Sequence, residues 1–318
     1  MADRAGFGFE TTVDEVLEGI DLTGQIAIVT GASGGLGAVA AGGLAKAGAA
    51  VTLTARDVQK AEKVAADIRA ATGNGDVSVM ELELQRPESV RRFAKAWLAE
   101  TTRLHILINN AGVMACPVAR TDEGWEMQFA TCHLGHFLLT ALLAPALEAG
   151  APARVVNVSS GGHRFSPVLF DDPHFEKTEY DKWVAYGQAK TANVLHAVEL
   201  DRRLRAKGVR AFGIHPGAIA TELGRHLQKE DIELMNSRIP GGKGLKFKPV
   251  EAGAATQVYA ATAPELEGQG GCYLEDCHIA GPRQLDSMEG VMPYAVDPEE
   301  AVRLWTLSEE ILGERFDV

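Results

Sequence analysis

Short apolar runs alternate with longer helical patterns along most of the chain. Five of these runs have the length and composition of buried strands, at residues 25–30, 50–55, 105–108, 155–158 and 209–214. Strands that are separated by helices do not pair as hairpins, so we expect them to run parallel in one sheet with the helices packed on both faces. The pattern therefore predicts an α/β fold built on a doubly wound parallel sheet.

The alternation continues without a break that would mark a domain boundary. The 318 residues are 46% hydrophobic, which is enough for one large core, although the length alone would also allow two domains. No polar linker, low-complexity tract or internal repeat interrupts the pattern. We therefore predict a single domain over residues 25–318 and an N-terminal arm of residues 1–24, in which Thr11 or Thr12 caps a short helix over residues 13–19.

A glycine-rich segment directly follows the first predicted strand. It has the sequence Gly31-Ala32-Ser33-Gly34-Gly35-Leu36-Gly37 and leads into an alanine-rich helical pattern. Glycines permit a tight turn and let backbone N–H groups approach a pyrophosphate, whose negative charge is favoured at a helix N-terminus. The segment is thus a candidate dinucleotide-binding turn, although a glycine turn without a ligand would have the same composition.

The second predicted strand ends at Ala55 and is followed by Arg56 and Asp57. In a dinucleotide-binding sheet this position lies beside the adenosine ribose. A carboxylate there would bind a free 2′-hydroxyl, whereas a guanidinium binds a 2′-phosphate through charge-assisted hydrogen bonds. The sequence therefore favours NADP(H), with NAD(H) as the alternative if Asp57 neutralises Arg56 in a surface ion pair.

Tyr186 and Lys190 are four residues apart in a helical pattern, so both side chains lie on one face. A cation near a phenol lowers the phenol pKa from about 10, which would give a proton donor or acceptor near neutral pH. The same spacing also arises by chance on solvated helices. Asn110 and Ser160 follow two other strands, and an open parallel sheet binds ligands at the carboxyl ends of its strands.

In their order and spacing these motifs resemble the short-chain dehydrogenase/reductase family over nearly the whole chain. The resemblance rests on Thr30-Gly31-x-x-x-Gly35-x-Gly37, Asn110-Ala111-Gly112, Ser160, Tyr186-x-x-x-Lys190 and His215-Pro216-Gly217. The segment around Ser160 and the long interval before Tyr186 are most similar to the retinol dehydrogenase-like branch and its bacterial oxidoreductase relatives. The resemblance implies a Rossmann-type fold and an oxidoreductase that interconverts an alcohol and a carbonyl compound by hydride transfer.

The resemblance also implies a role for each matching residue. Tyr186 would be the general acid/base, Lys190 would lower its pKa and hold the nicotinamide ribose, and Ser160 would bind the substrate oxygen, while Ser159 would be structural. Chemistry agrees, because hydride transfer at carbon needs one group to polarise the oxygen and another to relay its proton. The implied cofactor contacts are Gly31, Ser33, Gly35, Leu36, Gly37, Arg56, Glu83, Leu84, Asn110, Ala111, Gly112, Tyr186, Lys190, Pro216, Gly217, Ile219 and Thr221.

Two positions depart from the family pattern. Cys132 stands where the family has the asparagine of its catalytic tetrad, so the main-chain carbonyl is kept and the side-chain amide is lost. This puts the proton relay in question, and we expect the thiol itself to be a small buried group rather than a reactive one. Glu83 stands where relatives usually have an adenine-contacting aspartate, and it either reaches the adenine or lies exposed at a strand end.

Two segments between the motifs, residues 161–184 and 222–249, are expected to determine substrate specificity. They contain Phe165, Leu169, Phe170, Phe175, Trp183, Leu223, Leu227, Leu234, Met235 and Ile239, with Gly241 and Gly242 as a candidate hinge. Together with the branch resemblance they favour a bulky apolar alcohol, ketone or aldehyde, unless they only pack onto the body. The alternative functions are an NAD-dependent steroid or aromatic alcohol dehydrogenase and a cofactor-binding regulatory protein that has lost catalysis through Cys132.

The formal net charge of −12 opposes binding to nucleic acid phosphates or to an anionic membrane surface. No apolar run reaches the ~18 residues of a membrane span, and the acidic N-terminus lacks the regions of a signal peptide. The cysteines, Cys116, Cys132, Cys272 and Cys277, form no metal-ligand pattern and suit a reducing compartment. We therefore expect a cytoplasmic protein with a small-molecule substrate and no metal, and a homo-oligomer is compatible with the sequence.

Overall fold

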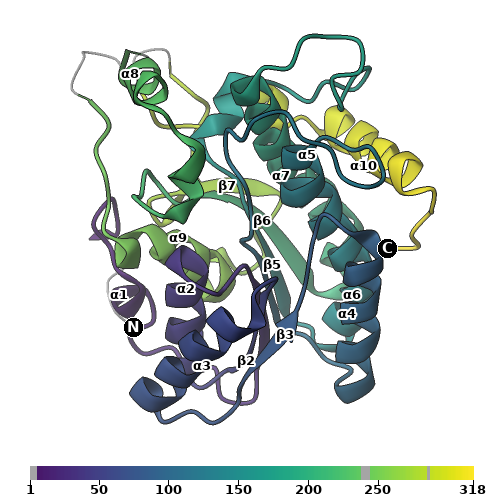
Figure 1. The fold of residues 1–318 in the computed structure, drawn as a ribbon. Helices are drawn as coiled ribbons and strands as arrows, with labels where there is room; N and C mark the ends of the chain where they lie inside the picture. Colours follow the sequence, from purple (N-terminus) through teal and green to yellow (C-terminus); the bar gives the residue numbers. More distant parts are fainter. Residues whose placement is uncertain (1–5, 238–243, 285–286) are drawn as a thin grey trace.

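Eight strands form one sheet in the computed structural model, which describes residues 6–237, 244–284 and 287–318 (Figure 1). The strands are β1 Ile26–Thr30, β2 Ala50–Ala55, β3 Val77–Glu81, β4 Ile106–Asn109, β5 Ala153–Val158, β6 Val209–His215, β7 Cys272–Glu275 and β8 His278–Ile279. Their order across the sheet is β3-β2-β1-β4-β5-β6-β7-β8, and all neighbours are parallel except β7 and β8. The predicted doubly wound, Rossmann-type sheet is confirmed.

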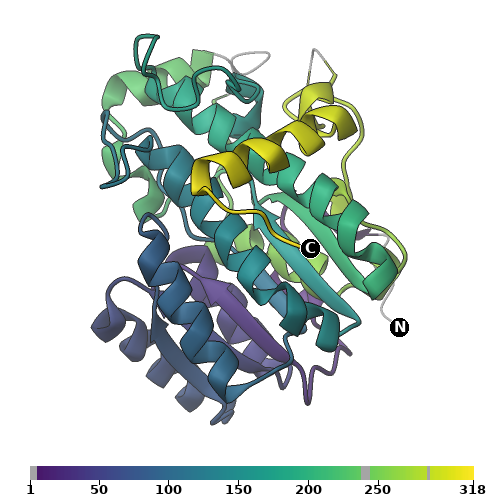
Figure 2. The same cartoon turned by 90° about the vertical axis from the view of Figure 1, so that its right-hand side faces the viewer.

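Helices cover both faces of this sheet (Figures 1 and 2). One face is covered by α2, α3 and α9 with the short α1, and the other by α4, α6, α7 and α10. The helices are α1 Val13–Val16, α2 Gly35–Lys46, α3 Val58–Thr72, α4 Pro87–Glu100, α5 Met127–Phe129, α6 Gly135–Ala149, α7 Lys182–Leu204, α8 Lys229–Ser237, α9 Val250–Thr262 and α10 Pro298–Leu312.

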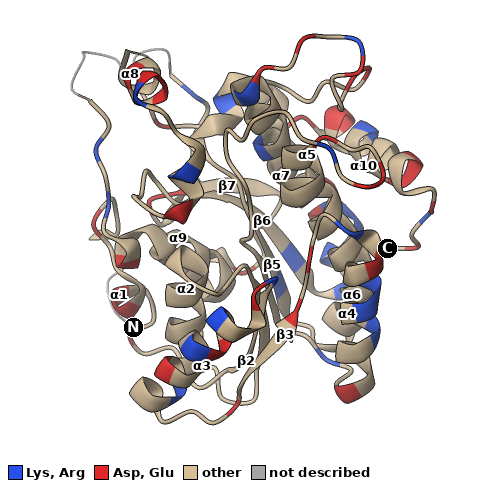
Figure 3. Cartoon of the chain, viewed as in Figure 1, with Lys and Arg blue, Asp and Glu red and all other residues tan. Residues whose placement is uncertain are grey.

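The strands are apolar on both sides because each side of the sheet is buried. Val29 and Ile108 belong to the core beneath α2 and α9, whereas Ile28 and Leu107 belong to the core beneath α4 and α6. This alternation follows from the two-residue period of a strand and explains why the runs are continuously apolar in sequence. Charged side chains of both signs lie along helices such as α3 and α4 instead (Figure 3).

The strand order reverses at β1, which pairs with β2 on one side and with β4 on the other. At such a reversal the connections leave toward opposite faces of the sheet and open a crevice at the carboxyl ends of the strands. The segments that follow β1, β4 and β5 carry the predicted motifs. The topology therefore brings these motifs to one edge of the sheet.

The N-terminal segment packs onto the domain through α1. The Thr12 hydroxyl accepts a hydrogen bond from the Glu15 backbone N–H at 3.4 Å, and the Glu15 carboxylate accepts one from the Thr12 N–H at 2.7 Å. This reciprocal capping box starts the helix. Val13 and Val16 are buried in the core beneath α2 and α9. The segment thus adds to the core, and the proposed boundary at residue 24 stays a prediction.

The sequence pattern did not indicate β7 and β8, which extend the sheet beyond β6. They contain only four and two residues, so neither is long enough to show a recognisable pattern. The two strands turn back on each other as an antiparallel pair. Their position matters for function, because the segment after them reaches the candidate site.

One helical segment of the described residues is long and apolar enough to cross a membrane, contrary to the expectation that none would be. It covers Met127–Ala149, which is 23 residues, and 83% of its apolar window is buried inside the protein. The helix α6 within it packs against α4. That burial is typical of the core helix of a globular domain. A cytoplasmic location and the lack of a membrane span stay predictions.

Leu22→Ala is expected to lower the free energy of unfolding by about 2–5 kcal/mol, because Leu22 is 3% exposed and its removal leaves a cavity between the N-terminal segment and the core. Chemical denaturation measures the change. Val302→Ala on α10 is the matched control, since Val302 is 42% exposed and a change of less than about 0.5 kcal/mol is expected there. Equal effects of the two substitutions would contradict the packing of the N-terminal segment.

Candidate active site

A cavity of about 1980 Å³ opens at the carboxyl ends of the strands. It exceeds the ~300–1,000 Å³ of a site for one small molecule, so it has room for a dinucleotide and a second ligand. Most of the predicted site residues line it: Gly31, Ser33, Gly35, Leu36, Arg56, Glu83, Leu84, Asn110, Ala111, Gly112, Ser160, Tyr186, Lys190, Pro216, Gly217, Ile219 and Thr221. Gly37 and Cys132 do not.

The glycine turn after β1 is shaped by close approach of backbone. Gly31 has φ +66°, and a Cβ there would lie 2.8 Å from the Ala111 Cα. A Cβ on Gly37 would lie 2.6 Å from Asn110 Nδ2, so this glycine serves packing of the turn rather than the cavity wall. Only glycine fits at either position.

The start of α2 presents unpaired backbone donors to the cavity. No side chain caps the helix at Gly34, and its first turn contains no acidic residue. Ser33, Gly34 and Gly35 line the cavity at this point. Backbone N–H groups at a helix N-terminus bind anions well. The residues present therefore fit the pyrophosphate of a dinucleotide.

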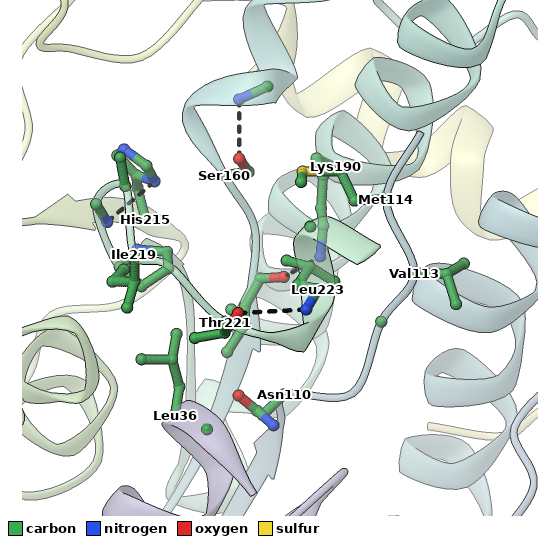
Figure 4. Close-up of a pocket in the computed structure, with 18 of the residues that line it drawn as sticks. Leu36, Asn110, Val113, Met114, Ser160, Lys190, His215, Ile219, Thr221 and Leu223 are labelled. Carbon is green, nitrogen blue, oxygen red and sulfur yellow. Dashed lines mark hydrogen bonds between the residues drawn. The ribbon is translucent and has the colours of Figure 1, made fainter. Parts of the chain in front are cut away.

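The hydroxyl of Thr30 holds the neighbouring motif against this turn. It accepts hydrogen bonds from the backbone N–H groups of Asn110 at 2.9 Å and Ala111 at 3.0 Å. The Asn110 side chain in turn donates to the Thr30 carbonyl at 2.7 Å. Asn110 and Leu36 both line the cavity (Figure 4). The two motifs thus form one continuous wall.

Arg56 lies exposed at the rim of the cavity, after β2. The Asp57 carboxylate accepts a hydrogen bond from the Lys60 backbone N–H at 2.9 Å and caps α3, and no ion pair joins it to Arg56 among the described residues. Lys60 also lines the cavity, where its Nζ pairs with Glu222 at 2.8 Å. The sequence analysis missed Lys60, although it lies four residues after Arg56 at the start of a helix.

Glu83 follows β3 and is held by its neighbours. Its carboxylate accepts a hydrogen bond from Gln85 Nε2 at 2.9 Å and lies 3.3 Å from Arg86 Nε. The side chain is 27% exposed and the residue lines the cavity. The structure thus places Glu83 at the predicted wall, with its carboxylate engaged locally.

Tyr186 and Lys190 both lie on α7 and are both 3% exposed. Lys190 Nζ donates to the Val158 carbonyl at 2.9 Å and lies 5.7 Å from the centroid of the Tyr186 ring. Ser160 follows β5, and its hydroxyl accepts a hydrogen bond from the Gly162 N–H at 3.0 Å (Figure 4). Two separate elements therefore bring the three predicted groups to one cavity.

We expected Lys190 to lower the pKa of Tyr186, but in this structure the pKa of Tyr186 is raised. Burial raises the pKa of the Tyr186 phenol above its usual value, and a hydrogen bond with the Ser160 side chain acts in the opposite direction. Burial also lowers the pKa of Lys190. The ammonium donates to the Val158 carbonyl, and burial is the largest influence on the phenol pKa.

The two adjacent serines have different surroundings. The Ser159 hydroxyl donates to the Lys190 carbonyl at 2.7 Å, which ties the end of β5 to α7. The Ser160 side chain is directed to the cavity instead (Figure 4). This difference agrees with the structural role expected for Ser159.

Cys132 is fully buried in a π-helical turn, Ala130–Leu134, between α5 and α6. Its sulfur lies 3.5 Å from the Val113 carbonyl, and its own carbonyl accepts a hydrogen bond from His136 Nδ1 at 3.0 Å. The helix distortion is therefore present without the asparagine amide. The carbonyl that would serve a proton relay is already engaged by His136.

The two predicted substrate segments both contribute to the cavity, but only through some of their apolar residues. Phe165, Trp183, Leu223, Leu227 and Met235 line it, whereas Leu169, Phe170, Phe175 and Leu234 do not. Ile239 and the candidate hinge at Gly241 and Gly242 lie outside the described residues. Further lining residues, not predicted from the sequence, are Phe9, Arg164, Lys248, Glu275 at the end of β7, and Arg283 after β8.

No group of three or more His, Cys, Asp or Glu side chains that could hold a metal ion occurs within residues 6–237, 244–284 and 287–318. Within these residues, His215 belongs to no such group. Its Nδ1 accepts hydrogen bonds from the Gly161 N–H at 3.0 Å and the Gly217 N–H at 3.3 Å. It thereby orders the turn after β6.

Comparison with known proteins agrees with this geometry. The family model of the short chain dehydrogenases matches residues 25–232. Retinol dehydrogenase 12 of Homo sapiens is 41% identical over 302 residues, which cover 94% of this chain and 89% of that protein. A protein of Streptomyces antibioticus with the name "Probable oxidoreductase" is 44% identical and is covered to 99%, with 92% of this chain matched.

Solved structures show the same architecture. An uncharacterized protein of Mycobacterium paratuberculosis has a TM-score of 0.74 and 34% identity, over 97% of this chain and all of that one. The NADP complex of Pseudomonas aeruginosa RhlG has a TM-score of 0.62 and 28% identity, over 80% of this chain and 95% of that one. The chain therefore belongs to the short-chain dehydrogenase family of oxidoreductases, whose members bind a nicotinamide cofactor.

Proposed function

We propose that this protein is an NADP(H)-dependent oxidoreductase that interconverts an alcohol and a ketone or aldehyde on a bulky apolar substrate. One observation carries the proposal. Ser160, which follows β5, lines the same cavity as Tyr186 and Lys190 of α7, and the N-terminus of α2, which no side chain caps, lies at this cavity too. A polarising hydroxyl, a proton donor and a cation beside an anion-binding turn are the groups that carbonyl reduction requires.

Each of the three groups has a separate task. A bound nicotinamide would supply or accept the hydride at the substrate carbon. Ser160 hydrogen-bonds the substrate oxygen, and Tyr186 gives a proton to that oxygen or removes one. Lys190 places a positive charge 5.7 Å from the Tyr186 ring, where it stabilises the phenolate that proton transfer creates.

The raised pKa of Tyr186 suits the reductive direction. A phenol whose pKa lies above its usual value stays protonated at neutral pH, so it is ready to donate to a carbonyl oxygen. In the oxidative direction the same phenol must first lose its proton, which burial opposes. Tyr186 is therefore expected to act as the proton donor when the reaction runs as a reduction.

The preference for NADP(H) rests on Arg56 and Lys60. Both cations line the cavity where the ribose after β2 would lie, and Asp57 is used as a helix cap. A guanidinium and an ammonium at this place suit a 2′-phosphate. The RhlG relative was solved with NADP, which agrees with this assignment.

The apolar part of the substrate is assigned to the wall made by Phe165 and Trp183 on one side and Leu223 and Leu227 on the other. The Phe165 and Trp183 rings are 5.5 Å apart in an edge-to-face arrangement. Such a wall binds aromatic or polycyclic surfaces by excluding water from them. A screen of aryl ketones, aldehydes and steroids, read by cofactor absorbance, tests the proposed reaction.

Tyr186→Phe is expected to lower kcat by about 10²–10⁴-fold, because the general acid is lost, while cofactor affinity stays near that of the parent protein. Lys190→Ala is expected to lower both kcat and cofactor affinity. Steady-state kinetics and cofactor titration separate the two effects. Tyr180→Phe is the control, since its hydroxyl bonds to the Cys116 carbonyl at 3.1 Å outside the cavity. Undiminished turnover in Tyr186→Phe would remove the proposed mechanism.

Arg56→Ala and Lys60→Ala are each expected to weaken NADP(H) binding by about tenfold or more, because each loses a charged contact with the 2′-phosphate, and to leave NAD(H) binding nearly unchanged. Lys63→Ala is the matched control, an exposed lysine on α3 that does not line the cavity. Calorimetric titration of each variant with NADP(H) and with NAD(H) measures these affinities. Tighter binding of NAD(H) than of NADP(H) by the parent protein would overturn the assignment.

Cys132→Asn is expected to preserve or raise kcat, because an amide at this place can donate to the Val113 carbonyl that the thiol contacts at 3.5 Å. Cys132→Ala, which removes the thiol without adding an amide, is not expected to raise it. Kinetics and thermal unfolding are measured together. A large loss of rate in a well-folded Cys132→Asn protein would give the cysteine a role of its own.

Cofactor binding by the parent protein without turnover on any carbonyl compound would instead favour a regulatory protein that has lost catalysis.

A further inference from the structure

Arg164 is a buried arginine beside the proposed catalytic serine. It lies in the 3-10 helix Gly161–Phe165, which begins directly after Ser160, and it lines the same cavity. Its side chain is only 8% exposed. A guanidinium has five N–H donors and loses much hydration free energy on burial, so it needs several acceptors.

The acceptors that the described residues offer to Arg164 are few. Nη2 donates to the Gly290 carbonyl at 3.2 Å, and the Glu275 carboxylate lies at 3.8 Å, beyond hydrogen-bond distance. No described group accepts a hydrogen bond from Nε, which is fully buried. The Glu275 carboxylate is also shared, since it accepts from the Gly290 N–H at 2.6 Å.

Arg210, which is partly buried, shows a contrast. Arg210 binds the Asp201 carboxylate through Nε at 2.8 Å and Nη2 at 3.0 Å, as a bidentate pair. That geometry satisfies a guanidinium within the protein. Arg164 has no such carboxylate at hydrogen-bond distance, and it lies at the cavity wall.

A second donor faces the same space. Because His215 Nδ1 accepts hydrogen bonds from two backbone N–H groups, the ring carries its proton on Nε2. His215 Nε2 and Arg164 Nη1 each lie 3.3 Å from the position that a Cβ on Gly161 would take. Two hydrogen-bond donors cannot bond to each other. Because Gly161 has no side chain, the space between Arg164 Nη1 and His215 Nε2 is open. The arrangement suits an acceptor from a ligand.

A second guanidinium lies close to this space. Arg283 lines the cavity here, and its charge adds to that of Arg164. Lys248 is already paired with Asp276. The acidic groups are the buried Glu275 and the exposed Glu289 at the rim. The buried charges of this cluster are therefore Arg164 and Glu275, with the half-buried Arg283 beside them.

We propose that Arg164, with His215, forms a subsite for a carboxylate group of the substrate. The substrate class is then a carbonyl compound or alcohol with an apolar body and one anionic end, the body packed on Phe165 and Trp183 and the carboxylate bound above Gly161. This inference rests on the proposed function and adds the anionic group to it.

The test compares 4-acetylbenzoate with its neutral methyl ester, which has the same aryl ketone. Calorimetry measures the affinity of each for the enzyme saturated with NADP⁺, and steady-state kinetics with NADPH measures kcat/KM. Arg164→Met is expected to weaken the acid by about tenfold or more relative to the ester, because charged hydrogen bonds are lost. Arg164→Lys keeps the positive charge but loses the planar guanidinium. It is expected to cause a smaller decrease in the ratio of acid affinity to ester affinity.

Arg154→Met is the matched control. Arg154 is also largely buried, donates to the Ala260 carbonyl at 3.2 Å and lies 3.7 Å from Glu267, but it does not line the cavity. Its replacement is expected to leave the ratio of acid to ester unchanged. If Arg164→Met does not fold, as judged by circular dichroism, the comparison of Arg164→Lys with the parent protein decides.

The outcomes separate this subsite from the proposed function. An unchanged ratio in the folded Arg164 variants overturns the subsite, while turnover of the ester keeps the reductase assignment. Absence of turnover with both ketones overturns the reductase assignment for this substrate class, and the calorimetric ratio still decides whether Arg164 binds a carboxylate. A loss of NADP⁺ affinity in Arg164→Met without a change in the ratio assigns the arginine to the cofactor and also overturns the subsite.

Discussion

The close contact between the segments that leave β1 and β4 is the constraint on which the rest of the site depends. Gly31 approaches Ala111 so closely that no side chain fits between them. The Thr30 hydroxyl accepts hydrogen bonds from the N–H groups that follow β4, and it lies 2.8 Å from His136 Nε2 on α6. One buried hydroxyl therefore fixes the glycine turn, the motif after β4 and the helix that contains Cys132 in a single arrangement.

Burial sets the electrostatics of the proposed catalytic groups within this frame. Removing Tyr186 and Lys190 from water shifts each pKa toward the neutral form of the group. Charge that develops during proton transfer must then be stabilised by nearby fixed groups, namely the Ser160 hydroxyl and the Lys190 ammonium, which the Val158 carbonyl orients. Such groups need no reorganisation when the charge appears, and this is why a buried pair can be effective where an exposed pair would not be.

The sequence could predict the elements that follow from local chemistry. The apolar runs gave the parallel strands, the glycines gave the turn after β1, and the spacing of Tyr186 and Lys190 placed both on one helix face. The sequence could not predict the effect of burial on the Tyr186 pKa, because that effect depends on residues distant in the chain. β7 and β8 were missed because strands of four and two residues have no readable period.

The same distinction applies to the two ends of the cavity. The cofactor end is built by turns that directly follow strands, so short motifs identify it. The substrate end is built by contacts between distant segments: Arg164 follows β5, but Gly290 and Glu275, which orient it, follow or end β7. An arginine in a loop reads as a solvated charge in sequence, and only the fold buries it beside Ser160. Under the proposed function, substrate specificity therefore depends on packing between distant segments, whereas the groups proposed for hydride transfer lie at or near strand ends of one sheet.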